Sequence, residues 1–170
     1  MKIDIFDTTL RDGFQQERIS PSVKDKLAIA KLIDELGVSF IEGGWPGASP
    51  KEEEFFLKAK EELDLKNSKL VSFGSTRKLN IAVEDDPQVK ALIDSGTDYV
   101  CIVGKSSKLH ITKALQTDVP NAIDMAVDTI KYLKSKNKKV FFDAEHFFDG
   151  YKEDSKTSLE ILDSVIQSGV

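Results

Sequence analysis

Short apolar segments alternate with longer amphipathic segments along the whole chain, and this alternation restricts the possible folds most strongly. The apolar segments, which we predict to be strands, are 3–6, 38–41, 69–73, 99–103 and 139–142. The segments between them repeat apolar residues at steps of three and four, which predicts helices over about 21–36, 50–63, 87–94, 119–136 and 155–168. Strands that alternate with helices predict an α/β fold with a parallel sheet covered by helices.

Two architectures satisfy this pattern. One is a doubly wound open sheet, and the other is a (β/α)8 barrel of typically about 250 residues, of which the five βα units of this chain would be about five-eighths. The first predicted strand is not followed by the Gly-x-Gly-x-x-Gly pattern of dinucleotide-binding folds. We therefore do not expect a dinucleotide site in the first unit.

Helix boundaries are marked by local capping signals. Ser20 precedes Pro21, which predicts Ser20 as the N-cap of the first helix, and Gly37 is expected to end that helix. Ser49 and Glu52 are three residues apart around Pro50, which is the pattern of a capping box. The second helix is therefore expected to begin directly after Ser49.

The composition limits the classes of protein to consider. With 24 Lys and Arg against 29 Asp and Glu, the net charge is −5, which argues against binding of a nucleic-acid backbone. The apolar runs are only a few residues long, far short of the roughly 20 that a membrane-spanning helix needs. The single cysteine, Cys101, excludes an intramolecular disulfide and fits a reducing compartment. We expect a cytoplasmic protein without nucleic-acid or membrane partners.

Polar residues gather where the first two predicted strands end, and in parallel α/β proteins these ends carry the chemistry. Arg11 and Asp12 follow the first strand, and Glu42 follows the second. A guanidinium fork suits a carboxylate or a developing oxyanion, and Asp12 offers hard oxygen ligands for a divalent cation. The simpler alternative for Glu42 is an ion pair with Arg11. Phe73, at the end of the third strand, is interpreted as core or as the wall of a pocket.

A second polar cluster follows the fourth and fifth strands. Alternation along the fifth strand places Asp143 and Glu145 on one face and predicts that His146 points to the other, as a structural histidine. Two inward carboxylates are costly unless they bind cations or transfer protons. His110 follows the fourth strand in a loop with Lys105 and Lys108; the three side chains are candidates for binding an anionic ligand, but loop lysines are usually solvated.

These segments together resemble a known family. Residues 7–13 (DTTLRDG) are similar to the signature of the metal-dependent TIM barrels that include isopropylmalate, homocitrate and citramalate synthases and hydroxymethylglutaryl-CoA lyase. Residues 41–47 (IEGGWPG), 73–77 (FGSTR) and 143–151 (DAEHFFDGY) resemble the citramalate synthases most. The resemblance implies a (β/α)8 TIM barrel and an acyltransferase that joins acetyl-CoA and pyruvate to give (R)-citramalate and CoA, a step toward isoleucine.

The resemblance also implies roles for particular residues. Arg11 would stabilise the developing oxyanion and Glu145 would take part in proton transfer, while Asp12 would bind a divalent metal ion such as magnesium, manganese or zinc. The substrate-binding residues that it implies are Gln15, Glu42, Phe73, His110 and Asp143.

Other features of the family pattern lie outside this sequence. Neither His110 nor His146 has a second histidine two residues away, whereas the family metal site also uses a His-x-His pair. We expect residues 1–170 to be the N-terminal portion of a barrel domain that, without its later strands and regulatory domain, is inactive alone. The full-length form is expected to be a homodimer. The alternatives are an isopropylmalate or homocitrate synthase, a lyase of the same superfamily, or a non-catalytic half-barrel partner.

Overall fold

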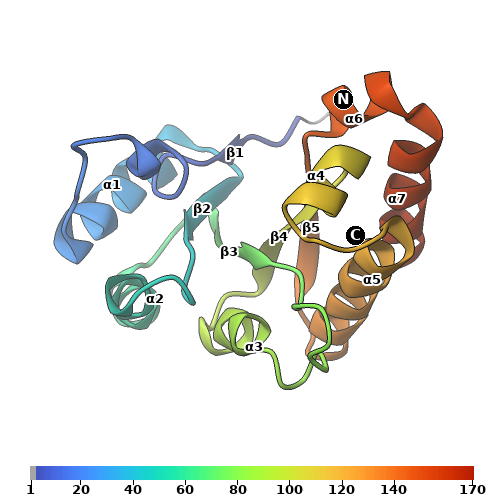
Figure 1. The fold of residues 1–170 in the computed structure, drawn as a ribbon. Coiled ribbons are helices and arrows are strands. Elements are labelled where there is room, and N and C mark those ends of the chain that lie inside the picture. The colour runs from blue at the N-terminus through green and yellow to red at the C-terminus, as the bar shows by residue number, and fades with distance from the viewer. Residues whose placement is uncertain (1–2) are drawn as a thin grey trace. The chain divides into compact units, whose positions relative to one another are not determined.

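The computed structural model describes residues 3–170 and contains the predicted alternation of strands and helices (Figure 1). Hydrogen bonds link the five strands in the order β1-β2-β3-β4-β5, and both β1–β2 and β2–β3 pair in parallel. Sequential strands in one sheet with intervening helices are the first five βα units of a (β/α)8 barrel, as predicted. The strands are Phe6–Asp7, Phe40–Gly44, Lys69–Ser75, Tyr99–Lys105 and Lys139–Glu145.

Eight helical segments connect and follow these strands. The first is a short 3-10 helix, η1, and the others are α-helices numbered α1 to α7 in chain order. Their bounds are Gly13–Gln15, Val23–Leu36, Pro50–Glu62, Pro87–Asp94, Lys108–Lys113, Val119–Ser135, Phe147–Glu153 and Ser155–Gln167. None of the helices in residues 3–170 is long and apolar enough to cross a membrane.

The chain divides into two compact units. The first contains residues 3–74 and 91–100, and the second contains 75–90 and 101–170. In the first unit, buried side chains of α1, β2 and α2 form a continuous apolar core. Burial of a single Leu, Ile or Phe in such a core stabilises the fold by about 1.5–3 kcal/mol. In the second unit, α5 contacts β5, α4 and α7, and α6 contacts α7.

The first strand differs from its prediction. It contains only Phe6 and Asp7, while Ile3 and Ile5 are 73% and 58% exposed. The carbonyl of Ile5 accepts hydrogen bonds from the backbone N–H groups of Ser39 and Phe40, so the chain reaches the sheet just before Phe6. The apolar alternation of residues 3–6 therefore does not report burial against helices.

The cap of α1 also differs from its prediction. The N-cap is Ser22, two residues after the predicted Ser20, and it forms a capping box with Asp25. The prediction placed Pro21 in the first turn, but the reciprocal Ser22 and Asp25 hydrogen bonds start the helix later. At the other end, Gly37 adopts the left-handed conformation with φ of 85°, and this part of the prediction is confirmed.

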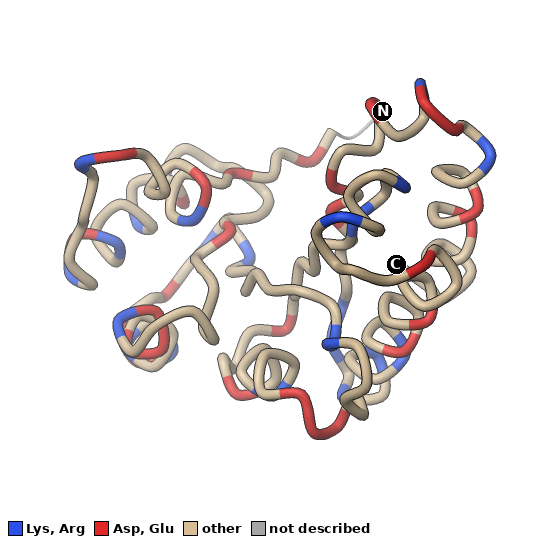
Figure 2. The backbone as a smooth tube through the Cα atoms, viewed as in Figure 1, with Lys and Arg blue, Asp and Glu red and all other residues tan. Residues whose placement is uncertain are grey.

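The helix α2 carries both acidic and basic residues (Figure 2). Its N-cap, Ser49, accepts a hydrogen bond from the backbone N–H of Glu52, and Pro50 is the first helical residue, as predicted. The carboxylate of Glu52, however, binds Lys26 and the backbone of Trp45. The lysine of another pair, Lys58, lies on the exposed surface of the helix 2.8 Å from Glu54.

Asp34 ties the end of α1 to the start of β3. Its carboxylate accepts hydrogen bonds from the backbone N–H groups of Lys66, Asn67 and Ser68 at 2.9, 2.9 and 2.7 Å, and the residue is only 6% exposed. Burial alone would raise the pKa of Asp34, but these three donors more than offset it and lower the pKa below its usual value. The ionised form of Asp34 is therefore the one that the fold stabilises.

We expect Asp34→Asn to lower the free energy of unfolding at pH 7 by about 2–3 kcal/mol, because the amide cannot accept all three hydrogen bonds. Since folding lowers this pKa, the stabilisation is present above the unfolded value of about 3.9 and is lost as the pH falls through the lower folded value. Urea denaturation between pH 3 and 7 measures this. Asp64→Asn, at a side chain that is 83% exposed, is the control. Equal effects of the two substitutions would contradict the assignment.

Candidate active site

Arg11 is the centre of a polar and aromatic cluster in the first unit. Its Nε lies 2.5 Å from Glu42 Oε2, and its guanidinium carbon lies 4.0 Å from the centre of the Phe73 ring. Glu42, the middle residue of β2, is 1% exposed, and the Arg11 side chain is 15% exposed. The ion pair between Arg11 and Glu42 was the simpler alternative for Glu42, and the structure contains it. Ion pairing and cation–π contact together orient the guanidinium.

Asp12 differs from Glu42 in its exposure. Its side chain is 65% exposed, and its Oδ1 lies 3.2 Å from Nη1 of Arg11. Arg11 therefore contacts a buried carboxylate through Nε and an accessible one through Nη1. Such a carboxylate is available to a ligand, because much of its surface already faces water.

Trp45 completes this cluster and was not predicted as part of the site. Its ring packs edge-on against Phe73, with ring centres 5.5 Å apart and an angle of 81° between the planes. Phe73 is 4% exposed and contacts both Trp45 and Arg11, so it is a core residue that supports the cluster. The sequence signal was the position of Trp45 directly after the strand that carries Glu42.

A cavity of about 210 Å³ lies beside Arg11. The predicted substrate residue Gln15, from η1, lines it together with Arg11. Its other walls come from the loop before α1, from α1, from the loop after β2 and from the start of α2, and include Lys26, Trp45 and Glu52. A larger cavity of about 310 Å³ lies at the amino ends of β3 and β4, beside Lys69 and Tyr99, and none of the predicted site residues lines it. The smaller cavity is therefore the one associated with the predicted chemistry.

Glu145 ends β5 in the second unit and forms an ion pair with Lys105, the last residue of β4. Their side chains are 34% and 25% exposed, so the pair is accessible. The backbone carbonyl of Glu145 also accepts a hydrogen bond from the N–H of Ser106 at 3.0 Å. Lys105 was expected to be solvated, and this expectation was wrong because the ends of the two strands place it against Glu145. Asp143, two residues earlier on β5, is half-buried.

The two histidines stack on each other. The ring centres of His110 in α4 and His146 lie 3.9 Å apart, with 25° between the ring planes. His146 has φ of 58° and follows the last residue of β5, so the alternation of the strand does not extend to it. The alternation that predicted an outward orientation for His146 therefore does not apply, and its interpretation as a structural histidine stays a prediction.

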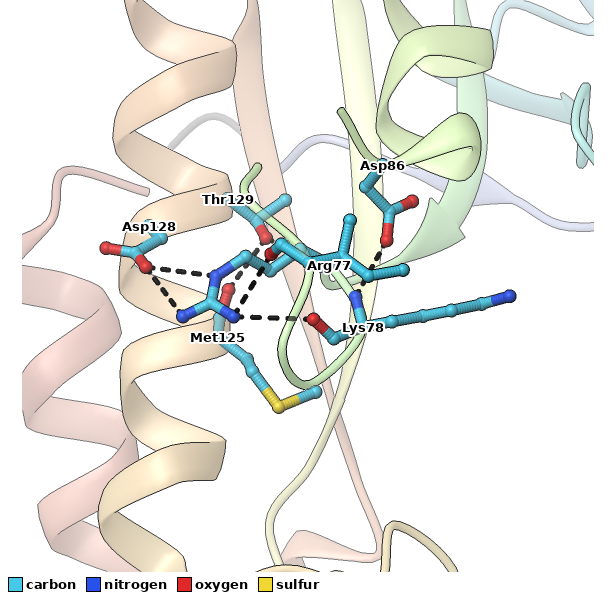
Figure 3. Close-up of polar contacts among 7 residues, drawn as sticks. Arg77, Lys78, Asp86, Met125, Asp128 and Thr129 are labelled. Carbon is cyan, nitrogen blue, oxygen red and sulfur yellow. Dashed lines mark hydrogen bonds and ion pairs between the residues drawn. The ribbon is translucent and has the colours of Figure 1, made fainter. Parts of the chain in front are cut away.

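Arg77 of the FGSTR segment points to α5 (Figure 3). Its Nε and Nη2 lie 3.0 and 2.7 Å from Asp128 Oδ2, and its backbone N–H donates to the hydroxyl of Thr129. The next residue, Lys78, donates its backbone N–H to Asp86, which is fully buried. This motif therefore attaches the loop after β3 to α5, and Arg77 serves the fold of the second unit.

The chain contains the first βα units of a barrel, a partly buried pair of Arg11 and Glu42, and an acidic residue, Glu145, at the end of a strand. These features are typical of TIM barrels, in which the chemistry lies at the carboxyl ends of the strands. The HMGL-like family model matches residues 2–170, so the chain belongs to the HMGL-like family. The recognition made from the sequence motifs is confirmed at this level.

Comparison with individual proteins narrows the relationship. The chain is 47% identical over 165 residues to the (R)-citramalate synthase of Streptomyces coelicolor and 49% identical over 168 residues to that of Aquifex aeolicus. These alignments include 97% and 99% of this chain but 31% and 32% of those proteins, so the chain spans about a third of the length of the curated relatives it matches. A 2-isopropylmalate synthase of Lysinibacillus sphaericus is 31% identical over 168 residues.

Solved structures support the fold. The HMG-CoA lyase of Bacillus subtilis superposes with a TM-score of 0.76 at 15% identity, over 99% of this chain and 56% of the lyase. At this identity the likeness concerns the fold alone, and it confirms the TIM-barrel prediction for these five units.

Proposed function

We propose that the protein carrying this chain joins acetyl-CoA and pyruvate to form (R)-citramalate and CoA. The 47% and 49% identity to (R)-citramalate synthases supports this activity over that of the 2-isopropylmalate synthases, which match at 31%. The structural observation that carries the proposal is Arg11, oriented by Glu42 and Phe73 beside a cavity. Residues 1–170 would form the N-terminal portion of the catalytic barrel in a cytoplasmic homodimer.

The reaction needs a proton acceptor first. A base removes a proton from the methyl group of acetyl-CoA, and the electron pair of that C–H bond forms the enolate. We assign this proton transfer to Glu145, an accessible carboxylate at the end of β5 that forms an ion pair with Lys105. The assignment rests on the position of Glu145 in the DAEHFFDGY segment and on its placement at the end of β5.

Carbon–carbon bond formation creates negative charge on oxygen. The enolate carbon attacks the keto carbon of pyruvate, the carbonyl electron pair moves to the keto oxygen, and that oxygen then takes a proton. Arg11 is assigned to stabilise this oxygen, because its guanidinium is held in place before the reaction. Water then cleaves the thioester and releases CoA. Gln15, Glu42, Phe73, His110 and Asp143 are assigned to substrate binding.

A divalent cation would polarise the keto group of pyruvate when bound. Asp12 fits one ligand position, because its carboxylate is exposed and oxygen donors suit such ions. Within residues 3–170, however, no group of three or more His, Cys, Asp or Glu side chains could hold a metal ion. The described residues therefore provide one proposed ligand and do not make a complete metal site.

The proposed activity is tested with the full-length protein and acetyl-CoA. We expect CoA release, measured with a thiol reagent, to be at least about tenfold faster in kcat/KM with pyruvate than with 2-oxoisovalerate or 2-oxoglutarate, because extra bulk in a fitted pocket costs about 1–3 kcal/mol. Chiral chromatography should identify (R)-citramalate. Preference for a larger 2-oxo acid would assign a related synthase instead, and cleavage of hydroxymethylglutaryl-CoA would assign a lyase. A protein that does none of these would favour the half-barrel partner.

A further inference from the structure

Lys26 is a buried lysine close to the Arg11 cluster. It lies on α1, is 1% exposed, and its Nζ donates hydrogen bonds to both carboxylate oxygens of Glu52 at 2.8 Å. The same Nζ lies 4.5 Å from the centre of the Phe55 ring. Burial lowers the pKa of Lys26, and the hydrogen bonds and charge of Glu52 offset this only in part. The buried ammonium group of Lys26 is therefore removed from water, and Glu52 is the carboxylate that neutralises its charge.

Glu52 connects this lysine to the loop after β2. Its Oε2 also accepts a hydrogen bond from the backbone N–H of Trp45 at 3.2 Å. Gly44, the preceding residue, has φ of 148°, and a Cβ there would overlap the Glu52 carboxylate and lie 2.8 Å from Lys26 Nζ. The absence of a side chain at Gly44 is what allows the ion pair to reach the backbone at the end of the strand.

Trp45 transmits this contact to the proposed active site. Its ring packs against Phe73, and Phe73 in turn lies against the guanidinium of Arg11. The side chains of Arg11, Lys26, Trp45 and Glu52 line the same 210 Å³ cavity. A continuous series of contacts therefore runs from Lys26 to Arg11 within one compact unit.

Buried ion pairs are a poor source of stability, because removal of both charges in favour of apolar side chains is often neutral or stabilising. An apolar pair at these positions could fill the space, but it could not accept the Trp45 N–H. We propose that Lys26 and Glu52 are positioning residues, which hold Trp45 against Phe73 and thereby keep Arg11 in its reactive orientation. The kinetic part of this inference rests on the proposed function.

The test compares two double variants of the full-length protein. K26M/E52Q keeps an amide oxygen for the Trp45 N–H, whereas K26M/E52M removes it. Trp45 is the only tryptophan in these 170 residues, and subtraction of the W45F spectrum isolates its emission. We expect acrylamide quenching of Trp45 to rise at least about twofold in K26M/E52M and to stay near the wild-type value in K26M/E52Q, because only the first loses the loop's hydrogen bond.

The matched control is K58M/E54M, which removes an exposed pair from the same helix and should change neither quenching nor kinetics. With pyruvate, kcat/KM should fall about tenfold in K26M/E52M, because one orienting contact is lost. In K26M/E52Q, kcat/KM should be close to the wild-type value. Unchanged quenching in a folded K26M/E52M, or an equal loss in both double variants, would overturn the proposal.

If K26M/E52M does not fold, E52Q decides the question. It should leave Trp45 protected, and increased quenching there would overturn the proposal. A wild-type protein that releases no CoA with any 2-oxo acid would refute the proposed function, while the quenching comparison would still decide the positioning role.

Discussion

Arg11→Lys in the full-length protein should lower kcat for CoA release with pyruvate by about 100-fold to 1,000-fold, the usual effect of losing an oxyanion donor. Lysine keeps the positive charge, but its three N–H donors are all on one nitrogen, so it cannot bind Glu42 and also place donors at the positions of both Nη atoms. It also loses the flat contact with Phe73 that orients the guanidinium. The charge is conserved, so we expect the loss to appear mainly in kcat and less in KM.

Arg77→Lys is a closely matched control for this experiment. Both arginine side chains are 15% exposed and both pair with a carboxylate, but Arg77 binds Asp128 on α5. We expect Arg77→Lys to change kcat by less than about twofold, because Arg77 contacts α5 and none of the assigned site residues. Steady-state CoA release and far-UV circular dichroism of both variants measure activity and fold. An Arg11→Lys protein with kcat within tenfold of wild type would refute the assigned role.

Glu145→Gln should reduce kcat by about 100-fold to 10,000-fold, because an amide cannot accept the methyl proton of acetyl-CoA. Glutamine conserves the shape of the side chain and can still accept a hydrogen bond from Lys105. Since both partners are partly exposed, we expect the fold to tolerate the change. Nuclear magnetic resonance of acetyl-CoA in D2O isolates this step, because enolate formation exchanges methyl protons for deuterium.

Glu153→Gln is the control for Glu145→Gln, since this exposed residue ends the short helix α6 that follows the same strand. It should leave both deuterium exchange and CoA release unchanged. If Glu145→Gln exchanges methyl protons at the wild-type rate but no longer forms the product, Glu145 acts after enolate formation. If both deuterium exchange and CoA release proceed at the wild-type rate in Glu145→Gln, Glu145 is not the proton-transfer group.

The sequence indicated the βα order correctly because burial periodicity is a local property. The strand that contains Cys101 and the long helix α5 are near their predicted positions for this reason. Burial of Ile3 and Ile5 depends on segments elsewhere in the fold, so the same apolar alternation failed there. The orientation predicted for His146 rested on the same alternation, but the strand ends one residue before it.

Some of the predicted site residues lie together in the first unit, while their roles stay predictions. Arg11 contacts both Glu42 and Phe73, because neighbouring strands of a parallel sheet bring these motif segments together. The Lys26–Glu52 pair could not be predicted in this way. Its residues are 26 positions apart on two helices, and Glu52 already had a sufficient local explanation as part of a capping box. In the structure, the Glu52 carboxylate instead contacts Lys26 and the backbone of Trp45.

Phe73 links selectivity to rate under the proposed function. The same ring is assigned to substrate binding and supports the guanidinium of Arg11. A smaller side chain at this position would admit a bulkier 2-oxo acid and would also release the group that stabilises the reacting oxygen. Adaptation of this scaffold to larger substrates is therefore easier through positions that do not touch Arg11, and drift at position 73 is constrained even though the residue itself carries no polar group.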